Sequence, residues 1–411
     1  MDVMIVGAGV GGLTLALELH QAGFQPRVFE AAPEIKPVGV GITLLPHCVK
    51  VLTELGLQDR LSQAGISTRE SAFFNRFGQL IYRESTGRDA GYEWPQIQIH
   101  RADLQMALLD AFRERVGADR LHTGWKCVAI EQSGTGVAAS FCEPSTGEMY
   151  PPQQADIAVG CDGLHSAVRS QLHPNEGDPR YSGVNMWRGV TRWKPYLGGS
   201  CYVRAGWLTP GKMVIYPIRN SIDDHGRQLI NWVAEVTTPQ YKRRDWNRPG
   251  RIDDFIAAFD DWHFDWLDVP AMIRAADAIL EFPMVDQDPL PWWTKGCVTL
   301  LGDAAHPMVP RGSNGAGQAI LDARSLSRAL VREPTPSAAL AAYERERLPA
   351  TTAIVQRNRQ NPPDAILREV YERTGDRPFH TIGDVISNEE LAAISDSYKV
   401  VAGYDRRSLH Q

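Results

Sequence analysis

The chain has 411 residues, of which 43% are hydrophobic and 22% are charged, and its formal net charge is −6. This length predicts two or three domains with an ample core, and the apolar and charged fractions are those of an ordinary globular protein. The acidic balance argues against nucleic acid or an anionic membrane as a partner. The short basic run at 242–244 is expected to be a solvated loop.

Cysteine usage and hydropathy indicate the compartment. The six cysteines form no C-x-x-C pair and no histidine cluster at ligand spacing, so we expect free thiols, no metal site and a reducing environment. No basic segment precedes the first apolar run, and no stretch reaches the roughly 18–20 apolar residues that span a bilayer. The sequence therefore predicts a cytoplasmic protein without a membrane partner.

Residues 2–30 carry a dinucleotide-binding signature. An apolar strand at 3–6 leads into Gly7, Gly9 and Gly12 with the spacing G-x-G-x-x-G. A helix and a second strand follow, and Glu30 stands at the end of that strand. Gly7 permits a tight turn, Gly9 lets a pyrophosphate approach backbone N–H groups, and Gly12 lets helix and strand pack closely. The helix N-terminus favours phosphate charge, and Glu30, about 20 residues after Gly9, is placed to bind a ribose.

The other expected elements follow from apolar periodicity and turn residues. Hairpins are expected at 71–83 and at 126–142, an antiparallel sheet at 181–236, and buried strands at 155–160 and 297–302. Helices are expected at 46–55, 102–116, 253–268, 269–276, 315–331 and 337–355.

The dinucleotide-binding signals lie at both ends of the chain, with a β-rich insert between them. We therefore expect an α/β fold with an α+β insert, in which a Rossmann-like cofactor domain is discontinuous and is formed by residues 1–72, 93–180 and 281–350. Residues 73–92 and 181–280 would form a β-rich substrate domain, and residues 351–411 a C-terminal helical segment.

Three further motifs point to the kind of dinucleotide. Arg101 begins a helix after a strand, where its planar cation can meet a pyrophosphate. Asp162 follows a buried strand, at the end where ligands of open α/β sheets collect. Asp303 also follows an apolar strand, and a glycine-rich loop then leads to a helix that begins at Gly315.

The segment 302–317 favours a flavin. Asp303 can hold the hydroxyl groups of a polyol, and the N–H groups at the Gly315 helix start can stabilise a ring that becomes negative when reduced. Such a helix terminus contributes roughly 0.3–1 kcal/mol, and about 2 kcal/mol when it is dry. A nicotinamide dinucleotide has no polyol linker, whereas FAD has one. The segment therefore predicts FAD.

Together, G-x-G-x-x-G with Glu30, D-G-x-x-S-x-x-R at 162–169 and G-D-A-A-H at 302–306 resemble the FAD-dependent aromatic hydroxylases. These are the single-component, group A flavoprotein monooxygenases typified by p-hydroxybenzoate and salicylate hydroxylases. The resemblance spans about residues 1–348. Finer features make the chain most similar to the phenazine-carboxylate hydroxylase branch, namely GVGI at 39–42, MWRGV at 186–190, DPLP at 288–291 and NGAGQAILD at 314–322.

The resemblance implies a role for each cofactor residue. Gly7, Gly9 and Gly12 would form the turn that holds the FAD pyrophosphate, and Glu30 would bind the adenosine ribose. Arg101 would lie along the ribityl-pyrophosphate chain, Asp303 would bind the ribityl hydroxyls, and Asp162 would serve both FAD and the transient NADH or NADPH. The residues beside the isoalloxazine would be Pro310, Gly315 and Ala316 on one side and Gly41 and Ile42 on the other. The family has G-x-G-x-N after Pro310, whereas this chain has RGSNG at 311–315.

The implied reaction is NAD(P)H- and O2-dependent hydroxylation of a small phenolic, aromatic-acid or phenazine-like substrate through a flavin C4a-hydroperoxide. The candidate catalytic residues are Tyr216, Pro310, His47 and Arg188. Tyr216 would steer or deprotonate the substrate hydroxyl, or would pack in a sheet core. Arg188 would meet a substrate carboxylate or pair with a local acid, and His47 would act at the site or merely pack.

Two other functions remain open on the sequence. The same scaffold supports an epoxidase, a decarboxylating hydroxylase or an oxidase. A non-catalytic carrier can also keep this fold, as Rab GDP-dissociation inhibitors do, although the acids Asp162 and Asp303 argue against it. The oligomeric state is expected to be a monomer or a homodimer.

Overall fold

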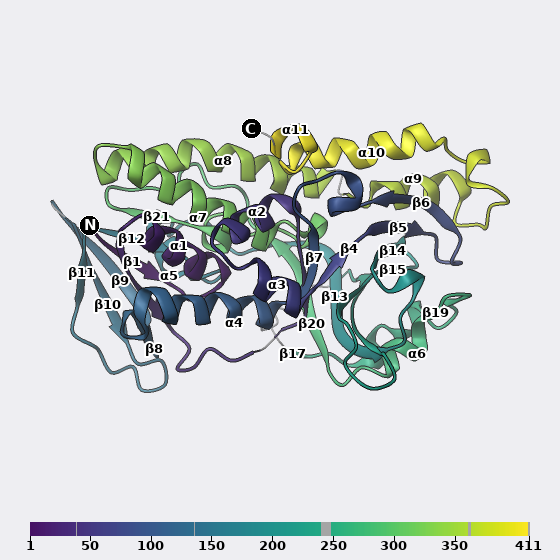
Figure 1. Cartoon of the computed structure of the whole chain (residues 1–411), viewed down its shortest axis with the longest axis horizontal. Helices are drawn as coiled ribbons and strands as arrows, with labels where there is room; N and C mark the ends of the chain where they lie inside the picture. Colours follow the sequence, from purple (N-terminus) through teal and green to yellow (C-terminus); the bar gives the residue numbers. More distant parts are fainter. Residues whose placement is uncertain (38, 135, 240–247, 361–362, 410–411) are drawn as a thin grey trace.

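The computed structural model describes residues 1–37, 39–134, 136–239, 248–360 and 363–409. The basic run at 242–244, expected to be a solvated loop, lies outside these residues. Figure 1 shows a parallel sheet with its helices on the left and a larger sheet on the right. Helices α8 (Pro336–Gln360) and α10 (Asn388–Val401) run along the top of this view.

The parallel sheet has five strands, and β1 (Asp2–Val6) lies at its centre. Each strand is paired in parallel with its neighbours. Such sheets are covered on both faces, which explains why their strands read as continuous apolar runs. The strand order is β21 (Val298–Leu300), β12 (Ile157–Gly160), β1, β2 (Gln25–Glu30) and β8 (Leu121–Thr123).

Helices that begin near one end of this sheet pack on one another. Helix α1 (Val10–Gln21) contacts α4 (Arg101–Phe112) and α7 (Gly315–Arg332), and α7 contacts α2 (Pro46–Glu54) and α8. The apolar side chains of α1 are buried at this junction, in the largest hydrophobic cluster. Packing of these apolar faces, rather than helix propensity, holds the layer in place.

The larger sheet has eight strands, with hydrophobic clusters formed by its side chains. Its neighbours are antiparallel, except that β5 runs parallel to β14. The order is β17 (Arg248–Pro249), β20 (Ile279–Asp286), β13 (Arg180–Trp193), β16 (Gln228–Thr237), β15 (Gly211–Arg219), β14 (Cys201–Trp207), β5 (Glu70–Phe74) and β6 (Leu80–Ser85).

Two small sheets and a hairpin complete the β structure of the residues that the structure describes. A three-stranded sheet consists of β3 (Gly41–Leu44), β7 (Gln96–His100) and β4 (Ile66–Thr68). Another contains β9 (Lys126–Ser133), β10 (Gly136–Cys142) and β11 (Gln153–Ala155), and β18 (His263–Phe264) pairs with β19 (Leu267–Asp268). The remaining short helices are α3 (Gln58–Ala64), α5 (Ala167–Leu172) and α6 (Val269–Arg274).

The C-terminal segment packs on the larger sheet. Helix α9 (Ala365–Thr374) contacts β5 and β14, and α10 contacts α8 and α9. A hydrophobic cluster joins Phe73 and Ile81 of the sheet to Ile366 of α9 and Leu391 of α10. A capping box between Ser387 and Glu390 fixes the start of α10, and α11 (Arg406–Leu409) follows it.

Most expected elements are confirmed, but the helix expected at 253–268 is wrong. Two 3₁₀ turns, Ile252–Asp254 and Ile256–Ala258, stand there, followed by the β18–β19 hairpin. At about 100° per residue, a single helix would place Phe264 on the face opposite Phe255. Both rings are buried in the same hydrophobic cluster, so the chain must turn between them.

The division into domains stays a proposal. The proposed boundaries at 72/73, 180/181 and 280/281 fall within β5, β13 and β20, and all three strands belong to the eight-stranded sheet. Placing the whole of each strand with its sheet moves these boundaries to 69/70, 179/180 and 286/287.

Every cysteine lies among the described residues and is a free thiol. Burial raises the pKa of the Cys48 and Cys127 thiols to about 12, which keeps these thiols protonated. None of the helices in the described ranges is both long and apolar enough to cross a bilayer.

A buried ionic network ties α7 to the turn after β21. The fully buried Asp322 carboxylate accepts a hydrogen bond from Gly302 N (3.2 Å) and from Arg347 Nε (2.7 Å), and it lies 2.5 Å from His306 Nε2. Burial by itself would raise the pKa of Asp322, but its interactions with His306 and with the Arg347 guanidinium outweigh burial and lower it.

We expect Asp322→Asn to lower the free energy of unfolding at pH 7 by about 3–5 kcal/mol, because it leaves the Arg347 charge buried without its anionic partner. Since the folded-state pKa is depressed, this stabilisation is present above the ordinary Asp pKa of about 3.9 and is lost as the pH falls through the lowered value. Urea unfolding of both proteins at pH 7 and below pH 4 measures the difference. Asp277→Asn, at a 78% exposed side chain, is the control and should cost no more than about 0.5 kcal/mol. An equal cost for the two variants at pH 7 would contradict this account.

Candidate cofactor and substrate site

The first turn is built to admit a ligand at Gly9. A Cβ atom at Gly9 would meet nothing within 4 Å, and no described side chain caps α1, so its first N–H groups are available. The other glycines are required by close packing. A Cβ atom at Gly7 would lie 2.4 Å from Cys161 O, and one at Gly12 would lie 2.0 Å from Gly7 O.

Glu30 anchors the same turn from the end of β2. Its Oε2 accepts a hydrogen bond from Ala8 N and its Oε1 accepts one from Ala32 N, both at 2.8 Å. A carboxylate has about four acceptor positions, so two remain for the hydroxyls of a ribose. Glu30 therefore both fixes the glycine turn and offers the acceptors that a dinucleotide requires.

Asp303 and the start of α7 lie close to this turn. A Cβ atom at Gly11 would lie 2.8 Å from Leu301 Cδ2 and 3.3 Å from Ala319 Cβ, which shows how closely α1 meets the α7 region. Asp303 is exposed, and its Oδ1 lies 3.8 Å from where a Cβ of Gly315 would be. No side chain in the described ranges caps α7, so the N–H groups of Gly315 and Ala316 begin an open helix terminus.

The D-G-x-x-S-x-x-R motif connects β12 to the Asp303 turn. The Asp162 carboxylate accepts hydrogen bonds from Ser166 Oγ and from Ala167 N (2.7 Å), so it caps α5. Burial raises the pKa of Asp162. The Arg169 side chain is buried, and its Nη1 donates to Ala304 O and Ala305 O, both at 2.9 Å. The sequence did not reveal this contact, because only the fold brings residues 169 and 304 together.

Arg101 is placed at the start of α4, as expected, with an exposed side chain. Its N–H donates to Val40 O at 2.9 Å, and its Cβ would lie 3.5 Å from a Cβ at Gly39. Gln105 of the same helix donates to Ala8 O at 3.0 Å. Helix α4 therefore connects the first glycine turn with the GVGI segment at 39–42.

Three side chains of the larger sheet hold the backbone of Gly41. Arg188 Nη2 and Tyr216 OH both donate to Gly41 O, at 2.7 and 2.8 Å, while Asn231 Oδ1 accepts a hydrogen bond from Gly41 N at 2.7 Å. A Cβ at Gly41 would lie 2.7 Å from Asn231 Cβ, so another residue would not fit. We call Arg188, Tyr216 and Asn231 the Gly41 clamp. The half-buried Ile42 follows in β3.

The structure places both Tyr216 and Arg188 in this clamp. Burial raises the pKa of the Tyr216 hydroxyl above its ordinary value, and burial lowers the pKa of Arg188, whose Nε has no partner in the described part of the chain. The Tyr216 ring stacks on Tyr202 at a centroid distance of 5.1 Å. A raised pKa keeps the Tyr216 hydroxyl protonated, so it is poorly suited to accept a proton from a substrate. Its hydrogen bond to Gly41 O indicates a positioning role instead.

The other two catalytic candidates are in different surroundings. His47 is 3% exposed, and neither ring nitrogen has a hydrogen-bond partner among the described residues. Burial lowers its pKa to about 3, and its ring stacks on Tyr404. Pro310 is exposed at the start of the loop that leads to α7. In that loop Ser313 has φ +58°, a left-handed conformation that favours glycine and that costs other residues about 1–2 kcal/mol.

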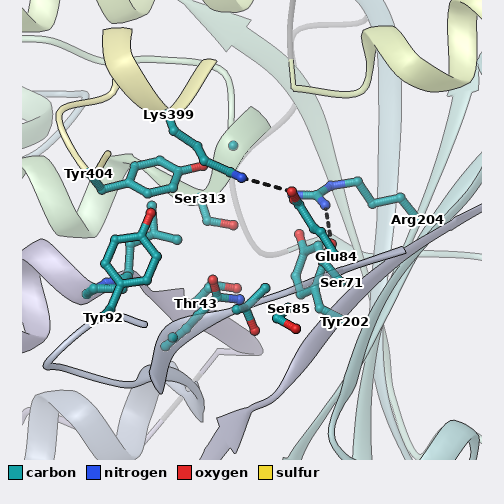
Figure 2. A pocket seen from close by; sticks show the side chains of 16 residues that line it. Thr43, Ser71, Glu84, Ser85, Tyr92, Tyr202, Arg204, Ser313, Lys399 and Tyr404 are labelled. Carbon is teal, nitrogen blue, oxygen red and sulfur yellow. Dashed lines mark hydrogen bonds and ion pairs between the residues drawn. The ribbon is translucent and has the colours of Figure 1, made fainter. Parts of the chain in front are cut away.

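A pocket lies beside this loop, and Figure 2 shows it from close by. Gly312 and Ser313 of the loop and Thr43 of β3 form one wall. The larger sheet contributes Tyr202 and Arg204, and the C-terminal segment contributes Lys399 and Tyr404. The other lining residues are Leu45, Pro46, Ser71, Glu84, Ser85, Thr86, Gly87, Tyr92 and Gln96.

Ion pairs hold the charged groups of the pocket. Lys399 Nζ lies 2.8 Å from Glu84 Oε2, and Arg204 Nε lies 3.1 Å from Asp364 Oδ1. Arg204 Nη1 also donates to Ser71 Oγ at 2.9 Å, and its guanidinium lies over the Tyr202 ring. Residues 364, 399 and 404 belong to a tail whose sequence carries no recognisable motif, so sequence reasoning missed them.

These residues fit FAD. Three features of the site match three parts of FAD. The open first turn matches a pyrophosphate, and the acceptors of Glu30 match a ribose. The exposed Asp303 at an uncapped helix terminus matches a polyol that leads to a ring which becomes anionic. All of them follow carboxyl ends of strands in one parallel sheet, or begin the helices after those strands. This fold and site define a dinucleotide-binding flavoprotein.

Comparisons with known proteins agree. A family model described as the FAD binding domain matches residues 1–358. Phenazine 1,6-dicarboxylic acid hydroxylase PhzS of Lysobacter antibioticus is 42% identical over 404 residues, which cover 97% of each chain. The 3-amino-4-hydroxybenzoate 2-monooxygenase PtnB3 of Streptomyces platensis is 34% identical over 87% of each chain. The structure of Klebsiella pneumoniae HpxO with FAD and uric acid has a TM-score of 0.76 at 24% identity and covers 97% of this chain and 96% of HpxO.

The chain therefore belongs to the FAD binding domain family. The resemblance inferred from the three motifs is confirmed, and with it FAD as the cofactor and FAD-dependent monooxygenase as the enzyme class. The roles of individual residues remain predictions.

We expect Arg169→Met to lower the free energy of unfolding by about 3 kcal/mol, because it leaves Glu176 and two backbone carbonyls at the Asp303 turn without their cation. The same variant should retain less FAD after purification, which the flavin absorbance per protein measures. Arg192→Met, at a 60% exposed side chain, is the control and should change neither quantity. Full FAD retention in Arg169→Met would contradict a link between this arginine and the cofactor turn.

We expect Tyr216→Phe to cost about 1 kcal/mol of stability, because one donor to Gly41 O is lost while Arg188 remains. The variant should keep the shape of the pH profile of kcat, and Asn231→Ala should behave in the same way, since it releases the same peptide. If Tyr216→Phe removed the basic limb of that profile while Asn231→Ala left it intact, Tyr216 would be a proton acceptor instead.

Proposed function

We propose that this enzyme hydroxylates an aromatic carboxylic acid in the pocket beside residues 312 and 313, with NADH or NADPH and dioxygen as co-substrates. The pocket carries the proposal. It adjoins the loop before α7, three tyrosine side chains line it (Tyr92, Tyr202 and Tyr404), and its two cations, Arg204 and Lys399, outnumber its single carboxylate, Glu84. Aromatic walls with a few fixed polar groups suit a planar ring that bears an acid.

Bound FAD supplies the redox and oxygen chemistry, and the chain supplies binding and orientation. The first glycine turn would hold the pyrophosphate, Glu30 the ribose, and Asp303 the ribityl chain. Gly315 and Ala316 would direct their N–H groups to the flavin ring from one side, and Gly41 and Ile42 would flank it from the other.

Two features of the chain would exclude water. The Gly41 clamp closes the contact between β3 and the larger sheet, and Tyr404 and Lys399 close the pocket on the side of the C-terminal segment. Exclusion of water matters because it would prevent side reactions in which the reduced oxygen is released as hydrogen peroxide instead of being transferred to the substrate. In this proposal Arg188 and Tyr216 act through Gly41 rather than by touching the substrate.

The names of the relatives support an aromatic carboxylic acid as the substrate. PhzS is named for phenazine 1,6-dicarboxylic acid and PtnB3 for 3-amino-4-hydroxybenzoate, and both compounds are aromatic carboxylates. The six free thiols support the cytoplasmic location expected from the sequence. We also propose that the protein is a monomer or a homodimer.

The experiment measures NADH and NADPH oxidation by the FAD-loaded protein against a set of aromatic acids, phenols and uncharged arenes. We expect an aromatic acid to stimulate oxidation and to gain one oxygen atom from labelled dioxygen, as mass spectrometry of the product reads out. Asp303→Ala should lose flavin absorbance and product together.

Stoichiometric peroxide with no labelled product would instead identify an oxidase, and an epoxide or loss of CO2 would identify the other flavoenzyme classes. Stimulation of NADH or NADPH oxidation by uncharged arenes alone would contradict an aromatic acid as the substrate.

A further inference from the structure

The C-terminal helix α10 contributes one charged side chain to the pocket, Lys399. Figure 2 shows it reaching from the C-terminal segment toward Glu84 on β6, while Arg204 enters from the larger sheet. The Lys399 side chain is 22% exposed and that of Glu84 15% exposed, so this ion pair is largely shielded from water. Charges in such surroundings interact more strongly than charges in bulk solvent.

Lys399 keeps a free donor, whereas the Arg204 guanidinium is paired with a buried carboxylate and held between two rings. An ammonium group has three N–H donors. Among the described residues, Lys399 Nζ gives one to Glu84 (2.8 Å) and one to Asp396 (2.9 Å), which leaves the third. Arg204 is fixed by Asp364, by Ser71 Oγ and by the rings of Tyr202 and Phe73.

Glu84 is held so that it restrains Lys399. Ser395 Oγ, one helical turn before Lys399, lies 2.9 Å from both Glu84 oxygens. Glu84 thereby positions the ammonium, and its charge also competes with any other anion for Lys399. An anion that enters the pocket would gain the free donor and would meet the repulsion of Glu84.

The neighbouring residue ties this part of α10 to the loop before α7. Tyr398 OH accepts a hydrogen bond from Asn314 Nδ2 and donates one to Asn358 Oδ1, both at 2.7 Å. A Cβ atom at Gly312 would lie 2.0 Å from Tyr398 OH, so the loop rests directly on this side chain. Lys399 is therefore held at a fixed distance from the loop on which the proposed function depends.

We propose that Lys399 is the specificity-determining residue that selects a carboxylate on the aromatic substrate, with Glu84 setting how strongly that carboxylate is bound. This inference rests on the proposed function. It places the acid group at the α10 end of the pocket and the ring among Tyr92, Tyr202 and Tyr404.

The test compares Lys399→Gln with the wild-type FAD-loaded enzyme on two matched pairs of probes. One pair is phenazine 1,6-dicarboxylate and phenazine, and the other is 3-amino-4-hydroxybenzoate and 2-aminophenol. We expect the Kd of each acid, measured by perturbation of the flavin spectrum, to rise about 10- to 100-fold, because a hydrogen bond to a charged group is lost. The Kd of each uncharged partner should change by less than about twofold.

Two further variants sharpen the result. Lys399→Arg keeps the charge and should restore most of the affinity for the acids, and Glu84→Gln removes the competing charge and should lower their Kd several-fold. Asp396→Asn is the control, because the Asp396 side chain is 70% exposed, so that solvent screens its charge, and it does not line the pocket. It should change every Kd by less than about twofold.

An equal loss of affinity for acids and uncharged partners in Lys399→Gln would show a packing role and overturn the proposal, as would no loss at all. Failure of both acids to bind the wild-type enzyme would also overturn it. The proposed monooxygenase activity is judged separately, by labelled product from any aromatic probe, so turnover of phenazine or 2-aminophenol alone would retain the activity and reject the role of Lys399.

Discussion

The close approach of two backbone turns, one after β1 and the other after β21, is the constraint on which the rest of the structure depends. Gly11 leaves no room for a Cβ against Leu301 and Ala319, and Gly302 has φ +63° and lies against the same Ala319. Because the strands are parallel, both turns open at one edge of the sheet. Segments about 300 residues apart in sequence thus meet at the edge of the sheet where we place the dinucleotide.

The second constraint is the Gly41 clamp, which joins the two halves of the molecule. Arg188, Tyr216 and Asn231 lie on three neighbouring strands, and all bind the two polar groups of one residue. Three hydrogen bonds to one backbone position in a buried place fix the larger sheet against β3. The position of the pocket relative to the cofactor site follows from this contact.

The cofactor half could be predicted because its physics is local: a glycine turn, a helix start and an acid at a strand end lie close together in sequence. The clamp could not, since Tyr216 in a β-rich run indicates only a strand, and its partner Gly41 is 175 residues away. Lys399 gave no signal either, because a polar residue on an amphipathic helix usually faces solvent. Tyr404 gave none because it lies between α10 and α11, in a tail whose sequence carries no recognisable motif. The aromatic run at 253–268 shows the converse error. Its periodicity suits a helix, but the chain forms two 3₁₀ turns and a hairpin, which bury both Phe255 and Phe264.

The position of β21 at the edge of the parallel sheet has a consequence for biosynthesis. Chains emerge from the ribosome N-terminus first, and domains fold as units once their residues are available. The last strand of the parallel sheet, Val298–Leu300, is made after all eight strands of the larger sheet, which end at Asp286. The strands of the nascent larger sheet can therefore assemble while the parallel sheet still lacks its edge strand, and the ribosome must release most of the chain before the parallel sheet is complete.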